Sequence, residues 1–123
     1  MTPAAIAFTY AHFVIEELVR QGVRYCCITP GARSSSLNIA ASHNNGLQVL
    51  TFVDERSAAF AALGISKSGS NPVVIITTSG TAVANLFPAV VEAHQTETPL
   101  IILTADRPPE LRGTRANQSI DQT

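Results

Sequence analysis

The sequence predicts an α/β domain, a three-layer sandwich in which a parallel sheet is flanked by helices. Apolar, β-branched segments alternate along the chain with helical patterns, which is typical of a parallel sheet with helices on both faces. The clearest strand, Val73-Val74-Ile75-Ile76-Thr77-Thr78, is continuously apolar, as expected for a strand buried on both faces. A length of 123 residues suits one domain with its own core.

The first helix has a start and a stop in the sequence. Thr2 followed by Pro3 is a helix cap before a favoured first helical residue, and Gly22 supplies the end. Between them, apolar residues recur at helical spacing: Ile6, Tyr10, Phe13, Val14 and Leu18.

Two strands and two helices follow. Residues 23–29 read as a mostly buried strand that Pro30-Gly31 breaks, and serines open a short helix over 34–43. A second strand over 47–53 leads into an Ala-rich helix over 57–68.

The second half repeats the alternation. The turn residues Gly69-Ser70-Asn71-Pro72 precede the strand over 73–78, and Ser79-Gly80-Thr81 turns into a helix over 82–96. That helix is apolar nearly all round, which predicts that it is sandwiched between other elements. Pro88 lies past its first turn and predicts a kink.

The chain ends in a strand and a polar segment. Residues 99–105 read as a fourth buried strand, which completes an α/β domain over 1–105. Residues 106–123 form a polar, irregular tail without a stop signal, so we expect the chain to be part of a longer protein.

Composition excludes several classes of function. The net charge is −1 and no basic run occurs, which argues against a nucleic-acid partner. No apolar run approaches the roughly 18 residues of a membrane span, and no signal peptide is present, so we expect a cytoplasmic protein. Charged residues make up only 14%, against about a quarter in typical domains, which predicts that a partner subunit or further domains cover part of the surface.

The cysteines and histidines predict no metal site. Cys26 and Cys27 are adjacent in a strand, so they point to opposite faces and cannot pair with each other. We expect them to be buried structural thiols. His12, His43 and His94 are isolated from one another and from the cysteines.

Four loops are expected at one edge of the sheet, because each follows a strand. They are Pro30–Ser36, Asp54-Glu55-Arg56, Ser79-Gly80-Thr81 and Asp106–Pro109. Three carry an Arg and two are rich in Ser, Thr and Gly, so free backbone N–H groups and guanidinium forks would form a receptor for carboxylate or phosphate. The sequence therefore predicts an anion-binding edge.

Glu55 is the leading candidate for proton transfer. The apolar strand runs directly into Asp54-Glu55-Arg56, and burial of a Glu in an apolar site raises its pKa into a useful range. The alternative is a helix start that favours acids through its dipole, with Glu55 solvated. No phosphate-binding P-loop and no Gly-x-Gly-x-x-Gly occurs, and Ser79 lacks the glycines of a nucleophile elbow.

Together the loops resemble one family. The motifs are Pro30-Gly31-Ala32-Arg33-Ser34-Ser35, Asp54-Glu55-Arg56, Thr78–Asn85 with Pro88-Ala89, Leu103–Leu111 and Ala116-Asn117-Gln118. Along nearly the whole chain they are similar to the N-terminal, pyrimidine-binding domain of the 2-succinyl-5-enolpyruvyl-6-hydroxy-3-cyclohexene-1-carboxylate synthases. These are thiamine-diphosphate-dependent transferases of menaquinone biosynthesis.

The resemblance implies a cofactor role for four residues. Glu55 would be catalytic, because a Glu at the matching position bonds N1′ of the cofactor's aminopyrimidine and so promotes proton loss from thiazolium C2. Ser79, Gly80 and Thr81 would lie close to the pyrimidine or the substrate. The diphosphate and Mg²⁺ are held in this family by a second domain whose acidic motif is absent from this sequence.

The resemblance also implies the substrates. The family decarboxylates 2-oxoglutarate and adds the resulting carbanion equivalent to isochorismate, which carries two carboxylates. Arg33 and Arg107 would bind substrate carboxylate, while Asn117 and Gln118 would bind substrate near the reacting atoms, with Gln118 as a second catalytic residue.

Two residues bear on the resemblance: Ala32 departs from the family's motif, and Arg107 has an alternative role. The family usually has Ser at the position of Ala32, so one substrate contact is missing at a cost of about 0.5–1.5 kcal/mol. Arg107 has an alternative role in a salt bridge with Asp106 or Glu110, which would contribute little if exposed.

The resemblance implies a homodimer or homotetramer whose active sites form between subunits, and an inactive chain when isolated. Two other interpretations stay open. One is another thiamine-diphosphate carboligase, of the acetolactate-synthase type, which Asp106–Pro109 and Asn117-Gln118 disfavour. The other is a non-catalytic anion-binding module.

Overall fold

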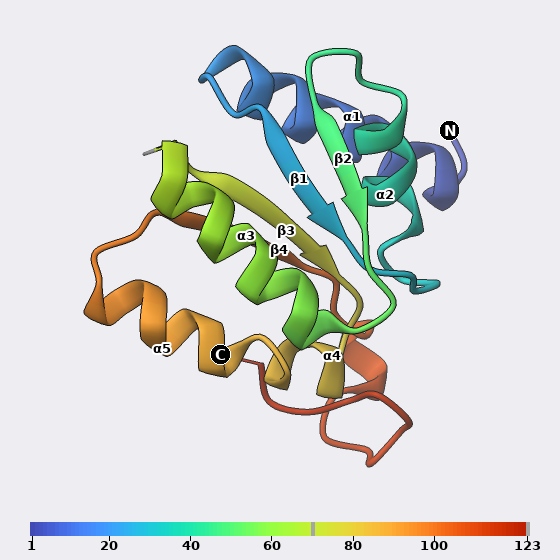
Figure 1. The fold of residues 1–123 in the computed structure, drawn as a ribbon. Helices are drawn as coiled ribbons and strands as arrows, with labels where there is room; N and C mark the ends of the chain where they lie inside the picture. The colour runs from blue at the N-terminus through green and yellow to red at the C-terminus, as the bar shows by residue number, and fades with distance from the viewer. Residues whose placement is uncertain (70, 123) are drawn as a thin grey trace.

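The described residues form a parallel sheet between two layers of helices, which confirms the predicted fold class (Figure 1). The structure is a computed structural model that describes residues 1–69 and 71–122. Ser70 of the predicted loop and Thr123 of the predicted tail lie outside the described residues.

The elements alternate as the sequence predicts. In chain order they are α1 (Pro3–Arg20), β1 (Tyr25–Ile28), α2 (Ser35–Ser42), β2 (Gln48–Thr51), α3 (Glu55–Gly69), β3 (Val73–Thr77), α4 (Thr81–Ala84), α5 (Phe87–Gln95), β4 (Leu100–Thr104) and the 3₁₀ turn η1 (Pro109–Leu111). Each strand lies inside its predicted range. The strand order is β2-β1-β3-β4, and all three pairings are parallel.

The sheet separates two apolar cores. Helices α1 and α2 cover one face and α3 and α5 cover the other (Figure 1). Adjacent residues of β1 point to opposite faces, so Cys26 lies in the first core and Cys27 in the second. Both cysteines are free and fully buried, as the sequence predicts.

Helix α1 begins and ends where the sequence predicts. The Thr2 hydroxyl accepts a hydrogen bond from the N–H of Ala5 at 3.2 Å, and Gly22 takes a φ of +98° just beyond the end. The face that packs on the sheet, however, carries Ala11 and Ile15. Tyr10, one of the residues whose spacing predicts the helix, is 71% exposed, because α1 is apolar on two opposite faces and only one can contact the core.

The predicted kinked helix over 82–96 is wrong, because the segment forms two helices. Helix α4 ends at Ala84 and α5 begins at Phe87, with Pro88 in its first turn, where the missing proline N–H costs no hydrogen bond. A turn at Asn85 and Leu86 joins them, closed by a hydrogen bond from the Leu86 N–H to the Val83 carbonyl.

Two predictions about burial are also wrong. Phe87 is 67% exposed, so α5 is not sandwiched, because no further layer of described residues covers its outer side. The apolar residues of β4 are only half-buried, because β4 is an edge strand and the described chain supplies no neighbour beyond it.

Helix α3 begins two residues earlier than predicted. Glu55 is its first residue, and the Asp54 carboxylate accepts a hydrogen bond from the Ser57 N–H at 2.7 Å. This bond lowers the pKa of Asp54. Asp54 therefore caps α3, while Glu55 stands in its first turn.

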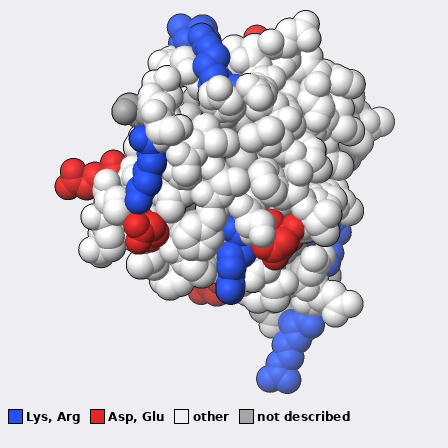
Figure 2. Space-filling model, in the orientation of Figure 1, with Lys and Arg blue, Asp and Glu red and all other residues white. Residues whose placement is uncertain are grey.

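The surface carries little charge. In the view of Figure 2 the charged side chains are few and scattered, and most of the surface is uncharged. Among the described residues, no helix is both long enough and apolar enough to cross a bilayer.

The buried thiols should make stability fall in alkali. Burial raises the pKa of Cys26 to about 12 and that of Cys27 to about 11, from 9.0. As the pH rises above 9, the unfolded chain loses these protons first, so the free energy of unfolding should fall by about 1.4 kcal/mol per pH unit for each thiol. Urea unfolding between pH 7.5 and 10.5 measures the slope.

The matched control replaces both thiols. Cys26→Ala/Cys27→Ala should lower stability at every pH but remove most of the alkaline slope. An unchanged slope in this variant would assign the pH dependence to other groups.

Candidate functional site

The direction in which successive strands are added to the sheet changes between β1 and β3. From β1 the chain continues to β2 on one side and then crosses to β3 on the other. Ligands of open α/β sheets bind at such a switch point, at the carboxyl ends of the strands. Five of the buried polar residues lie there, and they are Thr29, Ser34, Thr77, Thr78 and Ser79.

Hydroxyl groups join the two strand ends. The Thr29 hydroxyl contacts the Thr77 hydroxyl at 3.1 Å, and the Asn38 amide donates to the Thr29 carbonyl at 2.9 Å. Asn38 Oδ1 is buried and has no hydrogen-bond partner in the described part of the chain. Sequence reasoning assigned these residues no role, although Thr at the end of an apolar run is a usable signal for a polar strand end.

The first loop packs tightly against the third. A Cβ added to Gly31 would lie 2.3 Å from the Cβ of Thr78, so only glycine fits there without movement. Arg33, two residues on, is exposed and makes no hydrogen bond or ion pair within residues 1–69 and 71–122. Ala32 beside it is exposed too, and offers no side-chain polar group.

Glu55 is half-buried, so the described residues do not enclose it as the sequence predicts. Its Oε2 accepts a hydrogen bond from Asn85 Nδ2 at 3.2 Å. Oε1 makes no hydrogen bond within the described residues. Sequence reasoning missed Asn85, because a continuous helix over 82–96 gave it no reason to face α3.

The tail folds back onto the loop after β3. The Ser79 hydroxyl donates to the Gln118 carbonyl at 3.0 Å, and the Gly80 N–H donates to Gln122 Oε1 at 2.9 Å. The Gln122 amide in turn donates to the Ala105 carbonyl at 3.1 Å. Gly80 has a φ of +75°, and a Cβ there would lie 2.5 Å from Gln118 backbone atoms.

Arg107 is held by the same tail. Its guanidinium donates to the Asn117 carbonyl, while its Nε is buried and has no partner within the described chain. The carboxylate of Asp106 pairs with Arg112 at 3.0 Å. The salt bridge of Arg107 with Asp106 or Glu110 is therefore wrong, because Arg112 reaches Asp106 and the tail carbonyl takes the Arg107 guanidinium.

The structure brings most of the predicted site residues into two linked groups. Ser79, Gly80 and Gln118 are in contact, and Arg107 is bonded to Asn117 beside Gln118 in the chain. Glu55 is bonded to Asn85 at the end of the short helix that Thr81 begins. Thr81 and Arg33 are both exposed.

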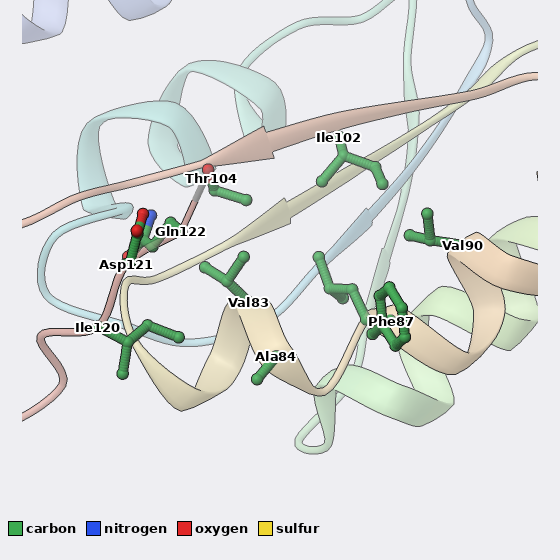
Figure 3. A pocket seen from close by; sticks show the side chains of 10 residues that line it. Val83, Ala84, Phe87, Val90, Ile102, Thr104, Ile120, Asp121 and Gln122 are labelled. Carbon is green, nitrogen blue, oxygen red and sulfur yellow. The ribbon is translucent and has the colours of Figure 1, made fainter.

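The described residues contain no group of three His, Cys, Asp or Glu side chains that could hold a metal ion. A groove of about 580 Å³ lies beside the edge strand β4. Figure 3 shows Val83 and Phe87 from the helices, Ile102 from β4 and Ile120 from the tail around it. None of the predicted site residues lines this groove.

Comparison with known proteins gives a family match. The family described as thiamine pyrophosphate enzyme, N-terminal TPP binding domain, matches residues 8–123. Among curated proteins, 2-succinyl-5-enolpyruvyl-6-hydroxy-3-cyclohexene-1-carboxylate synthases are similar to this chain. The proteins from Roseiflexus sp. (strain RS-1) and Halobacterium salinarum are 50% and 52% identical over 92% of this chain, and the protein from Shewanella baltica is 51% identical over 97%.

The chain spans about a fifth of the length of these relatives. The alignments cover 19% of the Roseiflexus and Halobacterium proteins and 21% of the Shewanella protein.

Gly80→Ala should release the tail. The variant places a Cβ against Gln118 and also strains a positive φ, so we expect a loss of about 2–4 kcal/mol of stability and faster tryptic cleavage after Arg115. Gly22→Ala is the matched control, because it has the same φ strain but nothing within 4 Å of its Cβ. Equal tail cleavage in both variants would refute the contact.

Proposed function

Because the chain belongs to the family of thiamine pyrophosphate enzyme N-terminal TPP binding domains, we propose that it holds the pyrimidine end of that cofactor (thiamine diphosphate) in a 2-succinyl-5-enolpyruvyl-6-hydroxy-3-cyclohexene-1-carboxylate synthase. The whole protein would decarboxylate 2-oxoglutarate and transfer the succinyl carbanion equivalent to isochorismate. The names of its relatives favour this reaction over that of another carboligase.

One observation carries the proposal. Glu55 presents an Oε1 that has no partner among residues 1–69 and 71–122, at the carboxyl edge of the sheet where Ser79, Gly80 and the tail meet. A flat heterocycle with a polar edge needs a precisely placed polar group to bond that edge, and a carboxyl oxygen that is free to bond a ligand supplies one.

The residues fit the cofactor at the pyrimidine end. Thiamine diphosphate, when bound, supplies an electron sink for breaking and making bonds beside a carbonyl carbon. Glu55 would bond the pyrimidine N1′ and share a proton with it. Ser79, Gly80 and Thr81 would lie close to the pyrimidine or the substrate, and the missing side chain of Gly80 leaves room for the Gln118 backbone.

Among the described residues, no site fits the diphosphate end of the cofactor. The described residues offer no cluster of acidic ligands for Mg²⁺. We therefore assign Mg²⁺ and the diphosphate to another part of the protein, and place the complete site between subunits of a homodimer or homotetramer. The isolated chain should then have no synthase activity.

The arginines bind substrate carboxylates. Arg107 is oriented by the Asn117 carbonyl, and its buried Nε–H has no partner within the described part of the chain, so a carboxylate oxygen could satisfy it. Arg33 is free of ion pairs within the described chain and supplies the second guanidinium. Asn117 and Gln118 contact the substrate near the reacting atoms, where Gln118 acts as the second catalytic residue.

Glu55→Gln tests the cofactor role in the full-length protein. Loss of proton sharing should lower kcat with 2-oxoglutarate and isochorismate by about 10²–10⁴-fold. Glu110→Gln, an exposed carboxylate on η1, is the matched control and should leave kcat unchanged. Near wild-type turnover by Glu55→Gln would refute the role.

Arg33→Ala and Arg107→Ala test the substrate role. Removing a charge-assisted hydrogen bond of about 1.5–3 kcal/mol should raise the KM of a substrate roughly 10-fold to 150-fold. Arg115→Ala, an exposed arginine of the same tail, should leave both KM values unchanged. If either variant keeps the wild-type KM for both substrates, the substrate-binding role of that arginine is refuted.

A further inference from the structure

We propose that Asn85 is a positioning residue that orients the Glu55 carboxylate so that Oε1 is presented to the ligand. This inference rests on the proposed role of Glu55. The two residues are 30 positions apart in the sequence, with Glu55 in the first turn of α3 and Asn85 at the C-cap of α4, yet Asn85 Nδ2 lies 3.2 Å from Glu55 Oε2.

Glu55 needs such a partner because little else restrains it. It stands in the first turn of α3 and is half-buried, and a free Glu side chain at such a position samples several rotamers. The amide of Asn85 is its only hydrogen-bond partner among the described residues. Holding Oε2 restrains the carboxyl group and leaves Oε1 open on the other side.

The chemical type of the partner matters as well. No Lys or Arg forms an ion pair with Glu55 within the described chain. A guanidinium or ammonium would neutralise the carboxylate and compete with the ligand for it. An amide donates one hydrogen bond and adds no charge, so the carboxyl group remains available to share a proton.

The fold fixes Asn85 in place. Its own N–H donates to the Thr81 carbonyl at 3.0 Å, and the next residue, Leu86, is 2% exposed and anchored in the core between the sheet and α3. Helix α5 begins at Phe87, with Pro88 in its first turn. The helix break that Pro88 accompanies therefore leaves Asn85 at the end of α4, directly opposite the start of α3.

A contact between α3 and the following helix, α5, provides a control. At the far end of α3, Lys67 pairs with Glu92 of α5 at 3.2 Å, and both side chains are exposed. Lys67→Met removes a link between α3 and α5 without touching Glu55. A purely structural role for Asn85 predicts that its variants behave like this one.

The test measures proton loss from the bound cofactor without substrates. In the full-length protein saturated with thiamine diphosphate, the rate of hydrogen–deuterium exchange at thiazolium C2 is followed by acid quench and proton NMR. Asn85→Leu, of similar volume but without a donor, should slow exchange 10-fold to 100-fold. It should lower kcat in parallel and leave the KM of both substrates within twofold. Lys67→Met should change none of these.

The outcomes separate this inference from the proposed function. Wild-type exchange in Asn85→Leu together with slow exchange in Glu55→Gln would overturn the role of Asn85 and leave the cofactor role intact. Wild-type exchange in Glu55→Gln would overturn the cofactor role itself. If Asn85→Leu does not fold, Asn85→Ala decides, because it removes the donor without adding bulk or charge, and wild-type exchange there would overturn the inference.

Discussion

The pairing of β1 with β3 is the constraint on which the site depends. It brings together the ends of two strands that are 48 residues apart, at Thr29 and Thr77, and it reverses the order of the sheet at that point. The loops after these strands must then pass each other closely, and Gly31 makes this possible by leaving room for Thr78. Apolar strands alone would form the sheet. The buried hydroxyl groups at the strand ends make this edge polar, which apolar packing does not require.

The tail completes this edge through backbone groups rather than through side-chain charges. Ser79 and Arg107 each donate to a tail carbonyl, at Gln118 and Asn117. Gln118 accepts this geometry at a φ of +55°, which is unusual for a residue with a side chain. Such a conformation persists only where surrounding contacts hold the backbone in place, and here the Gln118 backbone packs against Gly80.

The sequence was sufficient for the fold class, because β-branched runs and turn residues agree with the strand alternation. It was also sufficient to place Ser79 and Arg107 at one edge, since parallel strands place all their following loops together, whereas Gln118 was included only through the family resemblance. It could not distinguish the two apolar faces of α1. Tyr10 lies on one face and Ile15 on the other, and only the packing of α1 on the sheet shows that Ile15 is the buried one.

The Asn85–Glu55 contact illustrates the harder failure. It depends on a helix break that periodicity cannot reveal, because Pro88 is compatible both with a kink and with the first turn of a new helix. It also depends on the true start of α3, which lies two residues before the predicted one. A difference of two residues is ordinary at a helix end, yet here it decides which side chain contacts Glu55.

Half-burial of Glu55 has a consequence for the proposed chemistry. Proton sharing with a ligand is efficient where water is excluded, and Val53, which should form an apolar wall beside Glu55, is 90% exposed in this chain. An exposed valine cannot desolvate its neighbour unless another surface covers both. The proposed site between subunits would supply such a surface, so the same assembly that brings the diphosphate-binding part would also exclude water from Glu55. Orientation by Asn85 and desolvation by the partner are then separate requirements, and only the first is met within these residues.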